Sequence, residues 1–166
     1  GEAERHRVIT YDPNAPSASS RLVARPLKAA GNAKVTAVPV FFEGGLLTPL
    51  DNGQVALIDP ATGDRQALPF QPRVEAGIKI QWQRPAVIGS EFVIVDNRRK
   101  LYRVALKAQP EASLREAAQA EMEVEITSAL AAAGDTVYGV VRGPNSDTMV
   151  SIAAEDLAVG EEGALE

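Results

Sequence analysis

The chain has 166 residues, of which 22 are acidic and 17 are Lys or Arg, giving a formal net charge of -5. Such a chain lacks the clustered basic face of a nucleic-acid groove, and no apolar run reaches the roughly 18 residues that cross a bilayer. We therefore expect neither a nucleic-acid partner nor a membrane span, and the absence of cysteine excludes disulfides and thiolate metal sites.

The first predicted elements are two strands within residues 5–13 and 21–29, joined by a polar loop of turn-forming residues. We interpret them as the last two strands of a four-stranded unit whose first two strands are absent or supplied from elsewhere. The first residues contain no signal-peptide core, so we expect a mature domain or an excised piece.

The next unit covers residues 34–74 and contains a small apolar stretch, AVPVFFEGG from Ala37, followed by a predicted hairpin. Its turn is Asp51-Asn52-Gly53, and Asn-Gly is a strong hairpin signal because both residues tolerate positive φ. The apolar stretch suits an innermost strand packed near a central axis. The turn lacks the alternating acidic ligands and the distal Glu of a calcium loop, so we interpret it as a hairpin only.

The pattern of this unit returns twice along the chain. A shift of 46 residues relates Pro39, Leu46, Leu47, Val55 and Ile58 to Pro85, Phe92, Val93, Leu101 and Val104, and residue class is kept throughout. A third copy follows at offsets of 45 and then 48, with the slip inside the turn at residues 142–147. Because β-branched and aromatic residues alternate within each unit, this period predicts propeller blades and not helical arrays.

Residues 111–121, EASLREAAQAE, conflict with this pattern, because Ala, Glu and Arg favour a helix. Their position assigns them to the fourth, outermost strand of the second blade. Edge strands tolerate charge, so position can override propensity. We predict a strand, with a short helix on the outside of the blade as the alternative.

Together these elements predict an all-β fold of β-propeller-type repeats, with about three and a half four-stranded antiparallel blades that form part of a larger ring. The whole chain, 1–166, is then one repeat domain, with a partial blade at 5–30 and blades at 34–74, 78–123 and 124–162. Two arrangements stay open: the last unit closes on the first strands, or further blades complete the ring. We favour the second, because an open fragment exposes strand edges and an apolar face.

The stretch VALIDPATGD at residues 55–64 carries a more specific signal. Asp59 and Thr62 can bond local backbone amides, and Gly63 permits a left-handed residue. A strand ending in Asp and followed by a Thr-Gly turn resembles the repeat of the pyrroloquinoline-quinone-like (PQQ-like) propellers. The residues that carry the resemblance are Ala56, Asp59, Thr62 and Gly63.

Only this copy of the repeat has the motif intact, and Leu68 and Phe70 stand where that family usually has Trp. The resemblance implies several roles: quinone-dependent dehydrogenase, periplasmic assembly scaffold, or sensor domain fused to a kinase. A dehydrogenase needs a cofactor floor, a divalent cation and a catalytic Asp, and we find none of them. We therefore predict no catalytic residue, no metal site and no cofactor.

Two single residues limit other chemistry. His6 is the only histidine, which excludes histidine triads and multi-histidine metal sites. Trp82 is the only indole able to stack on a quinone, and its setting in KIQWQRP predicts packing between blades instead.

In a propeller, the turn between the second and third strands of each blade shares a face with the connectors between blades. We predict a protein- or peptide-binding surface there, since Arg offers a planar group with several donors. The candidate binding residues are Asp51, Asn52, Arg98, Arg99 and Asn145.

The resulting hypothesis is a non-catalytic scaffold that binds protein or peptide, in a periplasmic or otherwise extracytoplasmic compartment, with a role in assembly or sensing. The alternative is a fragment of a quinone-dependent or carbohydrate-active propeller enzyme. Self-association through exposed strand edges is a further expectation.

Overall fold

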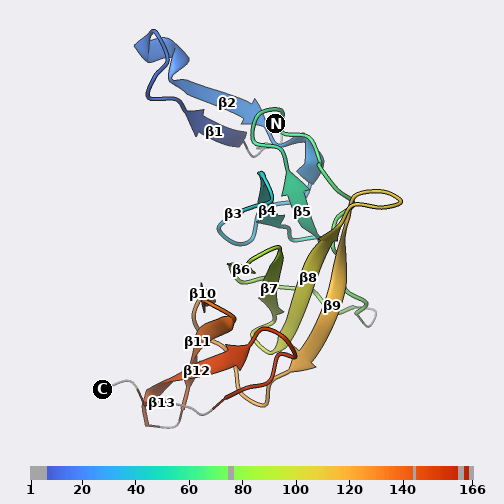
Figure 1. Cartoon of the computed structure of the whole chain (residues 1–166), viewed down its shortest axis with the longest axis vertical. Coiled ribbons are helices and arrows are strands. Elements are labelled where there is room, and N and C mark those ends of the chain that lie inside the picture. The colour runs from blue at the N-terminus through green and yellow to red at the C-terminus, as the bar shows by residue number, and fades with distance from the viewer. Residues whose placement is uncertain (1–6, 75–76, 144, 161–162, 165–166) are drawn as a thin grey trace.

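The chain folds almost entirely as β-structure (Figure 1). The computed structural model describes residues 7–74, 77–143, 145–160 and 163–164. Within these residues the strands form four antiparallel sheets, which follow one another along the chain and along the long axis of Figure 1. Two short 3-10 helices, η1 (Ala18–Ser20) and η2 (Lys28–Ala30), flank the second strand.

Strands that are consecutive in the chain are neighbours in every sheet. The first sheet pairs β1 (Arg7–Tyr11) with β2 (Leu22–Pro26). The second sheet contains β3 (Val40–Phe42), β4 (Gly45–Pro49) and β5 (Val55–Ile58). The third contains β6 (Ala86–Ile88), β7 (Glu91–Asp96), β8 (Lys100–Lys107) and β9 (Ser113–Glu121). The fourth contains β10 (Ala131–Ala133), β11 (Thr136–Arg142), β12 (Asp147–Ala153) and β13 (Gly163–Ala164).

The sequence repeat is reproduced in the register of the strands. Leu46 lies opposite Ile58 in the second sheet, Phe92 opposite Val104 in the third, and Val137 opposite Ile152 in the fourth. These are the positions that the offsets of 46, 45 and 48 residues relate to one another. The predicted all-β architecture of repeated antiparallel blades is therefore confirmed.

The second sheet has an irregular fourth edge. Single β-bridges join Ile58 to Arg65 and Val55 to Phe70, so the chain runs back along β5 without forming a continuous strand. Leu68 then makes a parallel bridge to Ser113 at the start of β9, which connects the outer edges of the second and third sheets.

Residues 113–121 form strand β9, so the strand predicted over the helix-favouring sequence is confirmed. The strand pairs with β8 along its whole length, interrupted by one register shift between Arg103 and Val104. Most of its side chains are exposed, as an outermost strand permits. Pairing with a long neighbouring strand has overridden helix propensity here.

Alternation of side chains gives each middle sheet two apolar faces. We call the face toward the previous sheet the incoming face and the face toward the next sheet the outgoing face. The outgoing faces carry Leu47 and Val55 in the second sheet and Val93 and Leu101 in the third. The incoming faces carry Ala56 and Ile58 in the second, Tyr102 and Val104 in the third, and Val150 and Ile152 in the fourth.

The short inner strands β3, β6 and β10 lie on the same side of the stack in Figure 1, and β6 contacts both of the others. The first and fourth sheets lie at opposite ends, and the sheets do not close into a ring. The arrangement in which the last unit closes on the first strands is thus not the one observed. The chain is a partial β-propeller.

Candidate functional site

The five candidate residues lie in the turns that join the second and third strands of successive sheets. We call these turns together the turn surface: residues 50–54 between β4 and β5, 97–99 between β7 and β8, and 143–146 between β11 and β12. Asp51 and Asn52 lie in the first, Arg98 and Arg99 in the second, and Asn145 in the third.

Asp51 holds the segment that leads into the second sheet. Its Oδ1 accepts a hydrogen bond from the Lys34 amide at 2.8 Å, and its own amide donates to the Lys34 carbonyl at 2.9 Å. The same reciprocal pair occurs one sheet later, between Asn97 and Gln81, at 2.9 and 3.0 Å. The Asp51 carboxylate is thus occupied in a repeated structural contact of the scaffold.

Asn52 lies at the exposed tip of the predicted hairpin, which the structure contains. Its Oδ1 accepts from the Gln54 amide at 3.1 Å, and Gly53 next to it has a φ of 84°. Only glycine adopts such a φ without strain, which explains the Asn-Gly pair. The side chain of Asn52 supports the turn and stays accessible to solvent.

Arg98 and Arg99 form the most exposed charged group of the turn surface. Arg98 Nη1 lies 3.9 Å from Glu125 Oε2, and Arg99 Nε lies 3.7 Å from Glu125 Oε1. Their side chains are 60% and 51% exposed. Both distances are longer than a hydrogen bond. The Glu125 carboxylate therefore partly neutralises the two guanidinium groups, while their N–H donors remain available to a ligand.

The backbone around the two arginines is fixed by the connector between the third and fourth sheets. The Ile126 amide donates to the Arg98 carbonyl at 2.8 Å, and the Met122 amide donates to the Arg99 carbonyl at 3.0 Å. The turn therefore presents its two cations from an ordered backbone.

Asn145 is exposed in a tight turn closed by a 3.0 Å bond from the Gly143 amide to the Ser146 carbonyl. No hydrogen bond or ion pair among the described residues joins it to the arginines of the previous turn. The structure thus brings Arg98 and Arg99 together around Glu125, whereas Asn145 remains separate. The sequence analysis did not identify Glu125, because its partners belong to another repeat.

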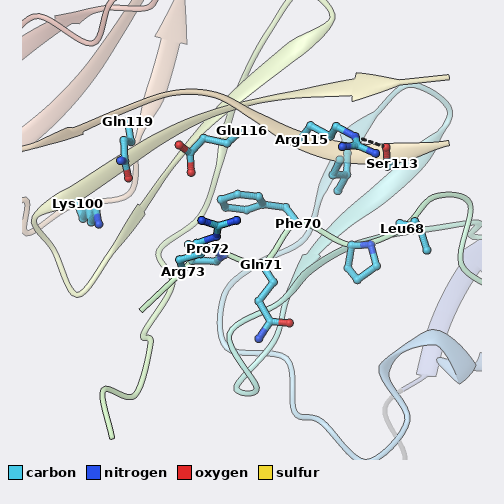
Figure 2. Close-up of a pocket in the computed structure, with 12 residues that line it drawn as sticks. Leu68, Phe70, Gln71, Pro72, Arg73, Lys100, Ser113, Arg115, Glu116 and Gln119 are labelled. Carbon is cyan, nitrogen blue, oxygen red and sulfur yellow. Dashed lines mark hydrogen bonds between the residues drawn. The ribbon is translucent and has the colours of Figure 1, made fainter. Parts of the chain in front are cut away.

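A groove that the sequence analysis missed opens between the outer edges of the second and third sheets (Figure 2). Its volume is about 700 Å³. One wall is the segment 68–73, which includes Phe70 and Arg73, and the other is formed by Lys100 and β9. The groove could not be predicted from a sequence motif within one repeat, because its two walls come from different repeats.

At the wall of the groove, Lys100 Nζ lies 5.6 Å from the ring centroid of Tyr102. The Tyr102 hydroxyl donates to Asp96 Oδ2 at 2.8 Å, and both side chains are buried. Burial raises the pKa of Asp96 and also that of Tyr102, whose hydrogen bond to the carboxylate raises it further. Removal from water is the first cause for both groups, since it disfavours the charged form.

Trp82 packs between sheets, as predicted. It is 4% exposed, and its ring lies 5.9 Å from Tyr102 and 6.1 Å from Phe70, centroid to centroid. Phe70 comes from the second sheet's edge and Tyr102 from the incoming face of the third. The indole is thus part of the core and has no open face on which a quinone could stack.

Among the described residues, no group of three or more His, Cys, Asp and Glu side chains is arranged to hold a metal ion. In the same part of the chain, no helix has the length and apolar character needed to cross a membrane. His6 lies outside the described residues.

Comparison with known proteins shows the fold. The chain is similar to BamB from Moraxella catarrhalis, with 18% identity and a TM-score of 0.56 over 80% of this chain and 36% of that one. It is similar to the β-propeller domain of Cps50 (Swd1) from Myceliophteria thermophila, with 15% identity and a TM-score of 0.63 over 96% and 52%. Glutaminyl cyclase from Myxococcus xanthus gives 12% identity and a TM-score of 0.54 over 81% and 52%.

These likenesses define a class, the β-propellers, and the chain spans between about a third and about half of the length of these structures. Since a cyclase stands among them, the fold by itself does not separate enzymes from binding proteins. No protein-family model matches the sequence, and no curated protein matches it either.

Proposed function

We propose that this partial propeller is a non-catalytic scaffold that binds protein or peptide through its turn surface. The observation that carries the proposal is the exposed Arg98–Arg99 pair, held on an ordered backbone and shared by a single carboxylate, Glu125. Because the backbone of both arginines is held in advance, binding needs to order only their side chains, and planar guanidinium groups pair well with carboxylates.

The ligand class that suits this pair is a peptide with acidic side chains. Such a ligand would compete with Glu125 for the two guanidinium groups. Asn52 would add a polar contact through its side-chain amide, while Asp51 would hold that neighbouring turn in place through its bond to the Lys34 amide. Asn145 would extend the surface toward the fourth sheet. Surface ion pairs contribute about 0–1 kcal/mol each, so we expect weak, salt-dependent binding built from several contacts.

The test uses acidic peptides selected from a random display library on the wild-type chain, with affinities measured by fluorescence polarisation. Arg98→Glu with Arg99→Glu should abolish binding while leaving the melting temperature unchanged. Glu125→Gln should strengthen binding, because it frees both arginines without changing the size of the side chain.

The matched control is Arg65→Glu with Lys107→Glu, which changes net charge by the same amount. These two exposed cations lie beyond β5 and at the end of β8, at the opposite ends of those strands from the turn surface. Loss of binding in the control would show that overall charge alone attracts the peptides. Retention of binding in the Arg98 and Arg99 variant would remove the turn surface from the proposal.

We further propose that the repeat is of the PQQ-like type. The turn after β5 supports this: the Ala61 amide donates to Asp59 Oδ1 at 2.7 Å, and the Asp64 amide donates to Thr62 Oγ1 at 3.2 Å. Gly63 has a φ of 76°. Asp59 and Thr62 therefore bond local backbone amides, and Gly63 adopts a left-handed conformation, as expected from the sequence. A family-wide alignment that kept Asp59, Thr62 and Gly63 in this turn would test the assignment.

The extracytoplasmic location and the role in assembly or sensing stay proposals that rest on the same resemblance. Fractionation of cells that express the protein from its native locus tests the location. Recovery in the cytoplasmic fraction alone would contradict it.

A further inference from the structure

The groove beside β9 lies between two consecutive sheets, away from both ends of the stack (Figures 1 and 2). The bridge between Leu68 and Ser113 joins its two walls at one end. In the segment that continues from Leu68, Pro69 and Pro72 have no N–H to donate to a neighbouring strand. Because the two sheets already pack on each other, a further sheet stacked on either end of the chain would not fill this groove.

Part of the groove lining is apolar and fixed by packing. Phe70 is 4% exposed, and its ring centroid lies 5.4 Å from that of Tyr102 and 6.1 Å from that of Trp82. Leu114, on the β9 wall, is buried in the same cluster. Sites that bind ligands are usually formed in advance, with apolar side chains and a few polar groups. The groove has such a lining.

The first half of β9 directs backbone groups into the groove. The Leu68 amide donates to the Ala112 carbonyl at 2.8 Å, and the Leu114 amide donates to the Leu68 carbonyl at 2.9 Å. Successive residues of a strand direct their amide and carbonyl groups to opposite edges, so the Leu114 carbonyl and the Glu116 amide follow on this same edge. Among the described residues, no printed turn or loop bond reaches these two groups. The chain thus leaves this edge after Leu68.

The second half of β9 directs further groups to the same edge. The register shift between Arg103 and Val104 changes the phase of the alternation. Beyond it, the Met122 amide donates inward to the Arg99 carbonyl at 3.0 Å. Alternation from there places the Gln119 amide on the outer edge. This edge therefore offers backbone donors and an acceptor along the length of the groove.

Charged side chains lie along the groove (Figure 2). At one end Arg115 Nε donates to Ser113 Oγ at 2.9 Å, whereas Lys100 and Gln119 lie at the other end. Arg73 comes from the opposite wall. Among the described residues, neither Lys100 nor Arg73 forms an ion pair. Both can therefore receive a carboxylate from a ligand.

The other polar side chains of the lining match a peptide. Gln71 Oε1 accepts from Gln54 at 3.2 Å, which leaves its amide N–H groups able to donate, and Gln119 offers a donor and an acceptor. Glu116 is the carboxylate of the lining and repels a second acidic group placed beside the first. The groove thus suits a main chain that carries one carboxylate near Lys100.

We propose that the groove binds an extended peptide, which pairs with the outer edge of β9 in the parallel direction already taken by Leu68. In this direction the N-terminal end of the peptide lies near Ser113 and its C-terminal end near Lys100. A carboxylate at the C-terminal end meets Lys100 and Arg73, and an apolar side chain contacts Phe70. Site and binding mode differ from those of the turn surface, and the occupant differs from the second copy expected in self-association through strand edges.

The test selects the probe from a synthetic library of short peptides with free C-termini and fluorescein at the N-terminus. Selection uses the chain with Arg98→Glu and Arg99→Glu, which lacks the cations of the turn surface. In fluorescence polarisation, Arg73→Glu and Lys100→Glu should each weaken binding of the tightest peptide about tenfold. Arg25→Glu, at an exposed position of β2, is the control and should leave the affinity within about twofold.

N-methylation of the peptide, one amide at a time, tests strand pairing without changing the protein. Every second amide of an added strand points toward β9. Methylation there should weaken binding about tenfold, whereas methylation of the intervening amides should have little effect. Amidation of the C-terminus separates the two possible carboxylates: a loss of affinity assigns the terminal carboxylate to Lys100, and no loss assigns an acidic side chain.

Equal effects of methylation at all amides would overturn strand pairing. Equal weakening by Arg25→Glu would show that overall charge attracts the peptide, and a library without a binder would overturn the proposal as well. Because selection is made without the arginines of the turn surface, each of these outcomes is independent of the proposed function.

Discussion

The hydroxyl of Tyr102 donates a 2.8 Å hydrogen bond to Asp96 Oδ2 inside the third sheet. The two residues belong to adjacent strands, β8 and β7, and Asp96 is one of the few polar residues buried in the described part of the chain. An acidic side chain therefore remains inside a mostly apolar core because a phenol from the next strand satisfies one of its oxygens.

The first prediction concerns the loss of this donor. Tyr102→Phe keeps the ring packed against Trp82 but leaves Asp96 without its side-chain donor. Leaving a buried acceptor unsatisfied costs about 1–3 kcal/mol, so the free energy of unfolding should decrease by that amount. Urea denaturation followed by Trp82 fluorescence measures it, with Tyr138→Phe on the half-buried outgoing face as the control.

The second prediction concerns pH. Burial raises the pKa of Asp96 above its ordinary value of 3.8, so the folded protein keeps this proton to a higher pH than the unfolded chain does. Between these two pKa values the folded state binds more protons, and the Asp96 contribution to the free energy of unfolding falls as pH rises.

Asp96→Asn removes this titration. We compare the variant with the wild type by subtracting the wild-type free energy of unfolding from that of the variant. This difference should increase as pH rises from below 3.8, because only the wild type loses the Asp96 contribution. It should become constant once Asp96 is ionised in the folded state as well. Urea denaturation across acidic and neutral pH measures the difference. A difference that does not change with pH would contradict the assignment.

The third prediction concerns Gly63. It has a φ of 76°, and a Cβ built there would lie 2.2 Å from the Pro26 carbonyl oxygen. Gly63→Ala should therefore destabilise the chain by about 3 kcal/mol, through backbone strain together with the contact. The control is Gly134→Ala, where φ is 59° and no atom lies within 4 Å, so about 1–2 kcal/mol from backbone strain alone is expected. Equal losses in thermal denaturation would contradict the contact.

The fourth prediction concerns Arg103, which joins the third sheet to the fourth. Its Nη1 donates to the Ala154 carbonyl at 3.1 Å and also to the Glu155 carbonyl, while its Nε lies 3.3 Å from Glu91 Oε2. The side chain is 22% exposed. Arg103→Met retains the apolar stem and removes the donors, so we expect a loss of about 1–3 kcal/mol.

Arg142→Met is the matched control for this change. Arg142 also pairs with a carboxylate, that of Asp147, at 3.4 Å, but its side chain is 75% exposed. Exposed pairs contribute about 0–1 kcal/mol, so the control should lose much less. Hydrogen exchange at Ala154 and Leu157 should speed up in the Arg103 variant only, because the contact that it loses lies there.

The local pattern of each repeat was sufficient to predict its strands. The offset of 46 residues related Leu46 and Ile58 to Phe92 and Val104, and the structure pairs the two residues of each set across their strands, because equivalent positions in a repeat face equivalent neighbours. Position in the repeat also assigned residues 111–121 to a strand against their helix propensity. Local bonding in the Asp59–Thr62 turn could be predicted because it involves residues close in sequence.

Contacts between repeats could not be predicted in this way. Glu125 beside Arg98 and Arg99, the carbonyl of Pro26 against Gly63, and the groove beside Phe70 each combine residues from different repeats. Their geometry depends on how far one sheet is rotated and shifted against the next, which no short-range pattern specifies.

The sequence by itself thus determined the repeated antiparallel blade and its hairpin turns, because alternation and turn chemistry act within a few residues. Only the tertiary structure decided which sheet faces pack against each other and which arginines share Glu125. Those properties arise from packing between sheets, where the energy depends on surfaces brought together from distant parts of the chain.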